Sequence, residues 1–174
     1  MQEQTPPDEL GWYIDPQLIN NPYQWIVELH SFELSLPLGQ DLQKAGLQSV
    51  ILEMRFPQDF PMSPPFVRVI RPRFLEFNAG GGGHVTMGGA LCMELLTGSG
   101  WLPTFSIENV LLSIRLALCS VDPKPARLAM SGSWLGSSSV RGGDYSVQEA
   151  VAAYIRACRA HGWEVPKDFE AMAW

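Results

Sequence analysis

The chain has 174 residues, of which 46% are hydrophobic and 17% charged, a composition typical of one globular domain and not of a disordered chain. Its 12 basic and 18 acidic residues give a formal net charge of −6, so we expect a monomer that binds neither nucleic acid nor a membrane. The cysteines, Cys92, Cys119 and Cys158, are odd in number and far apart, which argues against a disulfide scaffold or a metal site and favours a reducing compartment, the cytoplasm or the nucleus.

The chain begins with a polar segment. Residues 1–10 hold two prolines and no apolar core, so we predict a disordered lead-in rather than a signal peptide. A single domain is expected over residues 11–174. No run approaches the length of about 18 apolar residues that a membrane span needs.

Three segments in the first half of the chain are predicted as β-strands, the first two because apolar residues recur at every second position and the third because it is closed by Pro72. They are residues 23–36, 49–57 and 66–72. The polar segment 38–46 is predicted as a turn. The motif FPMSPP before the third strand has three prolines, so it is expected to be a stiff extended turn.

Residues 73–105 contain no long periodic segment, and a loop of this length in a compact domain is usually functional. It includes GGGGHVTMGGALCMELL, which places Cys92 eight residues after His84. No strand leads directly into the glycine run, no helix begins on it and no Gly-Lys-Ser/Thr follows it, which excludes a phosphate-binding loop.

Two helices are predicted in the second half of the chain, each with a serine N-cap. The first begins after Ser106 and is stopped by Pro123; the second begins after Ser146, which opens a capping box, and ends at Gly162. Residues 131–143 between them are rich in glycine and serine and are predicted to be flexible. Strands followed by helices, without βαβ alternation, indicate an α+β domain with an antiparallel meander.

The three cysteines fall into two groups. Cys119 and Cys158 lie on or near apolar helix stripes, where a thiol packs into the core. Cys92, in a glycine-rich loop, is open to two interpretations: one more buried thiol, or an accessible nucleophile. A Cys–His protease dyad with His84 is a further alternative, although no Asn or Asp is placed to orient the histidine.

In combination, the segments VILEMRFPQDFPMSPPFVRVIRPRF, GGALCMELLTGSGW and TFSIENVLLSIRLALCSVDPKPARL resemble the ubiquitin-conjugating enzymes. The family's Tyr-Pro-Phe-x-Pro-Pro turn corresponds to residues 60–65 and its Gly-x-x-Cys motif to residues 89–92. Its following tryptophan, expected to pack under the active-site loop, corresponds to Trp101. The Q-type branch is the most similar. The resemblance implies a UBC-like α+β fold, with a four-stranded antiparallel meander, a long active-site loop, a central helix and a C-terminal helix.

Three features depart from the family pattern. The family's His-Pro-Asn triplet falls on residues 82–84, so His84 takes the place of the asparagine. The family's acidic gate residue falls near Arg127, and an arginine there does not favour deprotonation of an incoming lysine. The family's first helix has no counterpart, since the two dozen or so residues before Trp25 include four prolines. The chain is then either a piece of a longer protein or binds its partners differently.

The resemblance implies that Cys92 carries ubiquitin, or a ubiquitin-like protein, as a thioester and yields it to a lysine or to a ubiquitin ligase. A ubiquitin-activating enzyme would use ATP upstream, so no cofactor and no metal are expected in this chain. His84 would order the loop or donate to the oxyanion, unless it is a loop residue in solvent. The alternative is a catalytically weak or inactive UBC-like module that binds ubiquitin or another partner. The presence of a cysteine, Cys92, at the position of the family's motif argues against this alternative.

Candidate partner-binding residues lie on other loops. Met62, Pro103 and Thr104 correspond to the family's two ligase-facing loops, or they are ordinary surface turn residues. Trp134 and Leu135, in the glycine- and serine-rich segment, either anchor a partner or fold back on the domain.

Overall fold

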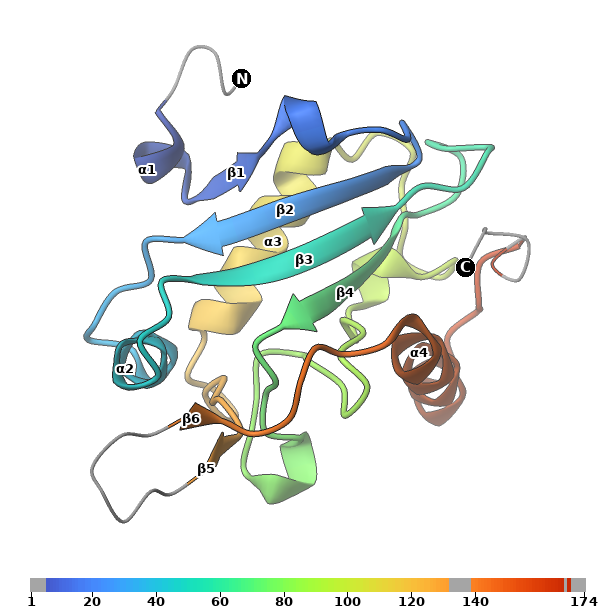
Figure 1. The fold of residues 1–174 in the computed structure, drawn as a ribbon. Coiled ribbons are helices and arrows are strands. Elements are labelled where there is room, and N and C mark those ends of the chain that lie inside the picture. Colours follow the sequence, from blue (N-terminus) through green and yellow to red (C-terminus); the bar gives the residue numbers. More distant parts are fainter. Residues whose placement is uncertain (1–5, 132–138, 168, 170–174) are drawn as a thin grey trace.

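The computed structural model describes residues 6–131, 139–167 and 169. Strands dominate the first half of the chain and two long helices the second, as the order of residue types predicts (Figure 1). The elements in chain order are α1 (Pro7–Leu10), β1 (Trp12–Ile14), η1 (Pro16–Leu18), β2 (Gln24–His30), α2 (Pro37–Lys44), β3 (Ser49–Arg55), β4 (Phe66–Arg71), η2 (Phe77–Ala79), η3 (Glu94–Leu96), α3 (Ile107–Cys119), β5 (Met130–Ser131), β6 (Ser139–Val140) and α4 (Val147–His161).

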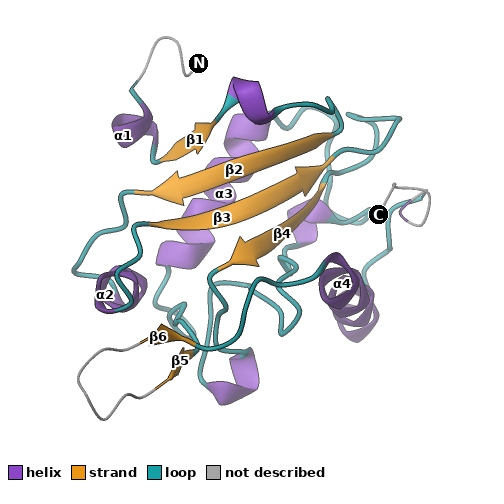
Figure 2. Cartoon of the chain, viewed as in Figure 1, coloured by secondary structure: helices purple, strands orange, loops and turns teal. Residues whose placement is uncertain are grey.

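The four main strands form one antiparallel sheet in the order β1-β2-β3-β4 (Figure 2). β2 and β3 pair over their full length, from Gln24 opposite Arg55 to His30 opposite Ser49. The four-stranded meander is therefore confirmed. β1 has only three residues, too few for a periodic pattern, and its position could not be predicted.

α3 crosses one face of the sheet, and the main core lies between the two (Figure 1). The predicted N-cap is confirmed: the side chain of Ser106 accepts a hydrogen bond from the backbone of Asn109, whose own side chain completes a capping box. The buried residues that the helix and the sheet contribute are Val110, Leu111, Ile114 and Leu118 from α3, and Val27, Leu29, Val50, Leu52, Met54, Val67 and Val69 from the strands.

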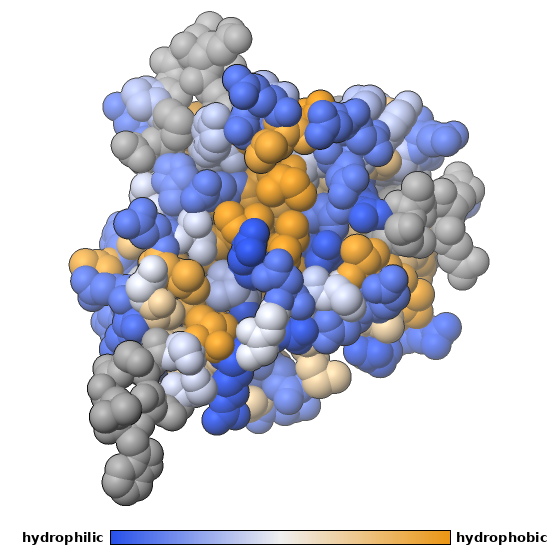
Figure 3. Space-filling model, in the orientation of Figure 1, coloured by the Kyte–Doolittle hydropathy of each residue, from blue (hydrophilic) through white to orange (hydrophobic). Residues whose placement is uncertain are grey.

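The other face of the sheet is turned toward solvent. Figure 3 shows apolar side chains gathered over β2 and β3 on this face. Among the residues that alternate with the core positions, Ile26, Ile51 and Ile70 are half-buried. The core thus lies on the α3 side, and the loops that leave the strand ends determine where the candidate site forms.

α4 lies beside β4 and forms a second core cluster (Figure 1). Its predicted ends are confirmed: Ser146 and Glu149 form a capping box, and Gly162 is the left-handed C-cap, with φ of 70°. The cluster also contains Phe66 from β4 and Ala90 from the loop that carries Cys92. α4 therefore supports the part of the loop that precedes Cys92.

The segment between β2 and β3 differs from the prediction. β2 ends at His30, six residues earlier than predicted, because Ser31 has a left-handed backbone with φ of 58°. The predicted turn that follows is wrong, since Pro37 starts α2 as its first residue and Leu38 and Leu42, one turn apart, are buried. A helix of eight residues offers only one such apolar pair, which is a weak pattern in the sequence.

The predicted N-terminal lead-in and the predicted flexible segment can also be compared with the structure. α1 is a single helical turn inside the predicted lead-in, and its Leu10 packs against the core. The segment 131–143 is closed at its base by the pairing of β5 with β6, while Trp134 and Leu135 lie outside the described residues. No helix in the described part of the chain has both the length and the apolar character to cross a membrane.

Candidate active site

Cys92 lies directly opposite His84 in a short hairpin that follows β4. The two arms run antiparallel: Val85 pairs with Leu91, and the backbone N–H of Cys92 donates to the carbonyl oxygen of His84 at 2.7 Å. The spacing of eight residues in the sequence is therefore the spacing of a cross-strand pair. The hairpin places the side chains of the two residues at neighbouring positions.

The imidazole of His84 binds the backbone of Cys92 rather than its thiol. Nδ1 lies 3.0 Å from the carbonyl oxygen of Cys92. A carbonyl oxygen only accepts, so Nδ1 is the donor of this bond. His84 also has a left-handed backbone, with φ of 59°, a region in which Asn, Asp and His are the usual non-glycine residues. The hydrogen bond from Nδ1 to the Cys92 carbonyl fixes both the His84 ring and the backbone of Cys92.

The hairpin is an extension of the main sheet. The backbone N–H of Leu91 donates to the carbonyl of Val67 at 3.1 Å, and that of Val69 donates to the carbonyl of Gly89 at 2.7 Å. These bonds attach the second arm of the hairpin to β4. Cys92 follows immediately, so the candidate nucleophile stands one residue beyond a strand that the sheet holds in place.

The glycine run before His84 packs directly against residues 124–126, which follow α3. The N–H of Gly82 donates to the carbonyl of Pro125 at 2.9 Å, and a Cβ on Gly82 would lie 1.8 Å from the carbonyl oxygen of Lys124. A Cβ on Gly83, whose φ is +75°, would lie 2.6 Å from the Cβ of Ala126. These glycines are needed because two backbones meet there.

The thiol of Cys92 is half-buried, and among the described residues no cationic group lowers its pKa. Burial raises the pKa of the thiol, and the neighbouring thiol of Cys158 raises it further. Cys158 is buried in the α4 cluster, which confirms its predicted role in the core, whereas Cys119 is half-buried and lies outside both clusters. In the described residues, no group of three His, Cys, Asp or Glu side chains is arranged to hold a metal ion.

The loop after Cys92 is held from two sides. The hydroxyl of Tyr154 on α4 donates to the carbonyl of Leu96 at 2.8 Å. The indole N–H of Trp101 donates to the carbonyl of Pro61 at 2.7 Å, and its ring packs against Phe60 and Phe105. Trp101 is therefore buried, and it ties the loop to the proline-rich turn.

The three candidate partner-binding residues are all on the surface. Met62 is 68% exposed, and Pro103 and Thr104 are exposed next to Leu102, which is 54% exposed. Since Trp101 binds Pro61, the two loops that carry these residues are neighbours. Leu102 was not predicted as a contact residue, although an exposed apolar residue in a turn is a usable signal.

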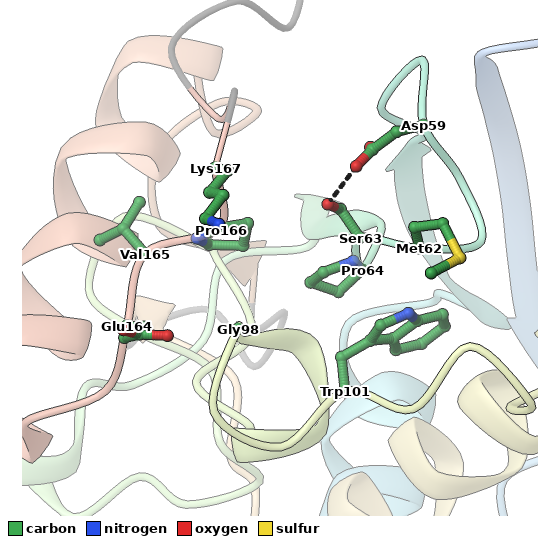
Figure 4. A pocket seen from close by; sticks show the side chains of 10 residues that line it. All are labelled: Asp59, Met62, Ser63, Pro64, Gly98, Trp101, Glu164, Val165, Pro166 and Lys167. Atoms are coloured by element: carbon green, nitrogen blue, oxygen red, sulfur yellow. Dashed lines mark hydrogen bonds between the residues drawn. The ribbon is translucent and has the colours of Figure 1, made fainter.

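A cavity of about 480 Å³ opens beside this surface (Figure 4). The proline-rich turn forms one wall, where the hydroxyl of Ser63 donates to the carboxylate of Asp59 at 2.7 Å. Residues 164–167, which follow α4, form the opposite wall, and Trp101 lies on the side of the proline-rich turn. The second wall comes from a part of the chain that no motif had marked.

Arg127 faces α2. Its Nε and Nη2 atoms donate to the two carboxylate oxygens of Asp41 at 2.7 and 3.0 Å, and the backbone N–H of Leu128 donates to the same carboxylate at 3.0 Å. The positive charge of Arg127 is thus paired with a carboxylate that is 2% exposed. Asp41 was missed because the helix that carries it was predicted as a turn.

Comparisons with known proteins agree with the motifs at the site. A family model described as ubiquitin-conjugating enzyme matches residues 48–134. The mouse protein named ubiquitin-conjugating enzyme E2Q-like protein 1 is 34% identical over 158 residues, which cover 88% of this chain and 89% of that protein. The mouse ubiquitin-conjugating enzyme E2 Q1 is 34% identical over 155 residues, covering 86% of this chain and 33% of that protein. A crystal structure of a ubiquitin-conjugating enzyme E2 from Plasmodium falciparum gives a TM-score of 0.49 at 24% identity, with 70% of this chain and 91% of that chain covered.

Proposed function

We propose that Cys92 carries ubiquitin or a ubiquitin-like protein as a thioester, because this chain belongs to the ubiquitin-conjugating enzyme family and to its Q-type branch. The observation that carries the proposal is the hairpin. The motif Gly-x-x-Cys at residues 89–92 matches Cys92 to the family's cysteine, and backbone bonds to His84 and to β4 hold Cys92 and the residues before it. A nucleophile on a rigid support needs little rearrangement before it attacks.

The chemistry consists of two acyl transfers. In the first, the sulfur of Cys92 attacks the C-terminal glycyl carbonyl of ubiquitin, which arrives as a thioester on the activating enzyme. A new carbon–sulfur bond forms, the old one breaks, and the thiol proton of Cys92 goes to the departing thiolate. In the second, a lysine amine or a ligase thiol attacks the same carbonyl, and the sulfur of Cys92 leaves and takes up the proton that the attacking group loses. ATP is consumed only in the upstream activation, so the chain needs no cofactor.

His84 acts in this proposal as a positioning residue. Its Nδ1–H is already bound to the carbonyl of Cys92, and this bond holds the chain at Cys92. The loop-ordering role is therefore favoured over the oxyanion role. A protease dyad is disfavoured because, within the described residues, the ring makes its hydrogen bond to the Cys92 carbonyl and none to the thiol.

The neighbouring loops that carry Met62 and Leu102–Thr104 are proposed to contact the ubiquitin ligase. Met62 and Leu102 are 68% and 54% exposed, and they follow Pro61 and Trp101, which are hydrogen-bonded to each other. Replacing Met62 or Leu102 by alanine is expected to lower ligase-stimulated discharge while loading of Cys92 continues at its normal rate. Equal losses in both steps would contradict this assignment.

A loading assay tests the function. The chain is incubated with a ubiquitin-activating enzyme, ATP and ubiquitin, and the products are separated with and without thiol reductant. The expected product is a reductant-sensitive adduct of one ubiquitin that is absent in Cys92→Ala. The matched control is Cys119→Ala, since Cys119 is also half-buried but lies at the end of α3, and this variant is expected to load normally.

The same assay distinguishes thioester transfer from the alternative of a non-catalytic binding module. A folded wild-type chain that forms no adduct with ubiquitin or with ubiquitin-like proteins, each with its own activating enzyme, would refute thioester transfer. If that chain still bound ubiquitin in solution, the non-catalytic binding module would be the correct assignment.

A further inference from the structure

The Asp41–Arg127 pair joins two segments that are far apart in the sequence. Asp41 lies in the middle of α2, its side chain is only 2% exposed, and it accepts three hydrogen bonds, two from the guanidinium of Arg127 and one from the backbone of Leu128. A buried carboxylate that loses its cationic partner is left uncompensated, so the position of Arg127 is strongly specified.

The Asp41–Arg127 pair holds residues 124–128 in place. The glycine run before His84 packs against this same segment. The carbonyl of Arg127 accepts a hydrogen bond from the N–H of Leu75 at 2.8 Å, and the carbonyl of Pro125 accepts one from Gly82 at 2.9 Å. A side chain at Gly82 would collide with the carbonyl of Lys124. The two backbones are therefore in direct contact along this stretch.

The contact extends to Gly83, the residue that directly precedes His84. Gly83 lies against Ala126, and the next residue is His84, whose left-handed backbone and Nδ1 hydrogen bond order Cys92. A displacement of the segment that carries Arg127 must therefore be taken up by the glycine run or by the conformation of His84, because a close-packed contact transmits movement.

We propose that the Asp41–Arg127 pair positions the Cys92 site. By binding the buried carboxylate of Asp41, Arg127 fixes residues 124–128 against the glycine run, and this contact maintains the bond between His84 and the Cys92 carbonyl. Arg127 thus has a structural role: it attaches its segment to α2. The inference rests on the proposed function for its meaning, but two of its three readouts need no ubiquitin.

The experiment compares three variants of the 174-residue chain. Asp41→Asn removes the charge at nearly constant volume, and Arg127→Lys keeps the charge but loses the two-pronged geometry. Asp144→Asn is the control, since Asp144 forms an exposed pair with Arg71 at 3.6 Å and has no contact with the glycine run. The readouts are the ¹⁵N chemical shifts of the His84 ring, the rate at which iodoacetamide alkylates Cys92, followed by peptide mass spectrometry, and ubiquitin discharge to free lysine.

The wild-type ring is expected to give the widely separated nitrogen shifts of a single Nδ1–H tautomer. In Asp41→Asn and Arg127→Lys these shifts should move toward each other as the tautomers mix, Cys92 alkylation should accelerate several-fold, and discharge should slow several-fold. The double variant should be no worse than the more impaired single variant, because both changes break one interaction. Asp144→Asn should match the wild type in all three readouts.

Folded Asp41 and Arg127 variants with wild-type His84 shifts and a wild-type alkylation rate would overturn the proposal. If Asp41→Asn does not fold by circular dichroism, Arg127→Lys decides, because it leaves the buried carboxylate a cationic partner. A wild-type chain that fails to load ubiquitin would refute the proposed function alone, since the ring shifts and the alkylation rate would still report on the positioning of Cys92.

Discussion

Gly82→Ala is the most direct perturbation of the contact that supports the Cys92 hairpin. The added Cβ would lie 1.8 Å from the carbonyl oxygen of Lys124 and 2.6 Å from its carbonyl carbon. Non-bonded carbon and oxygen atoms need about 3 Å or more, so the two backbones must separate by roughly 1 Å. Strain of this kind costs about 1–3 kcal/mol of folding free energy, which a domain of ordinary stability tolerates. A displacement of about 1 Å at a reacting group can slow its chemistry by roughly 10²-fold.

The assay is single-turnover loading of Cys92 with ubiquitin, followed by discharge to free lysine, at a temperature well below the unfolding midpoint of the variant. Gly143→Ala is the matched control, because a Cβ there meets no atom within 4 Å and Gly143 has no positive φ. The control should load and discharge at wild-type rates. If Gly82→Ala also does so and keeps the wild-type unfolding temperature, the glycine run is not held by the segment after α3.

The remaining predictions concern single side chains. His84→Gly should change stability by no more than about 1 kcal/mol, because losing one hydrogen bond is offset by relief of the left-handed backbone. The same variant should load ubiquitin several-fold more slowly, and a loading rate equal to that of the wild type would contradict the positioning role. Burial raises the pKa of Cys92, so the reactive thiolate is the minor form near neutrality, and alkylation should accelerate steadily from about pH 7 to about pH 9; a plateau reached below about pH 8 would be inconsistent with this. Tyr145→Phe removes the hydroxyl that accepts from the backbone N–H of Phe74 at 2.9 Å, and the buried donor left behind should cost about 1–3 kcal/mol in urea unfolding. A loss below about 0.5 kcal/mol would mean that the N–H finds another acceptor.

Sequence patterns determined those parts of the fold that depend on residues close together in the sequence. The start of α3 at Ser106 and both ends of α4, at Ser146 and Gly162, follow from bonds between a side chain or backbone group and residues three or four positions away. β3 was located by alternation within a single strand, and the end of β4 by the proline that follows it. The cysteine and the proline-rich turn belong to a family pattern that the comparisons then supported.

The sequence alone could not locate elements too short to carry a period. β1 has three residues, and α2 has a single pair of buried leucines on either side of Asp41. Both are stabilised by what they pack against: β1 by pairing with β2, and α2 by the core and by Arg127. An element whose stability comes from tertiary contacts leaves little trace in its own residues.

Only the tertiary structure decided what His84 and Arg127 do. In the sequence, His84 stands where the family has an asparagine and Arg127 stands near its acidic gate, and each position left the role open. The fold turns the ring of His84 onto the carbonyl of Cys92, eight residues away, and the guanidinium of Arg127 onto Asp41, 86 residues away. Because a side chain's hydrogen-bond partner depends on which segments the fold brings together, spacing along the chain identified the residues, and their roles follow from contacts that spacing does not encode.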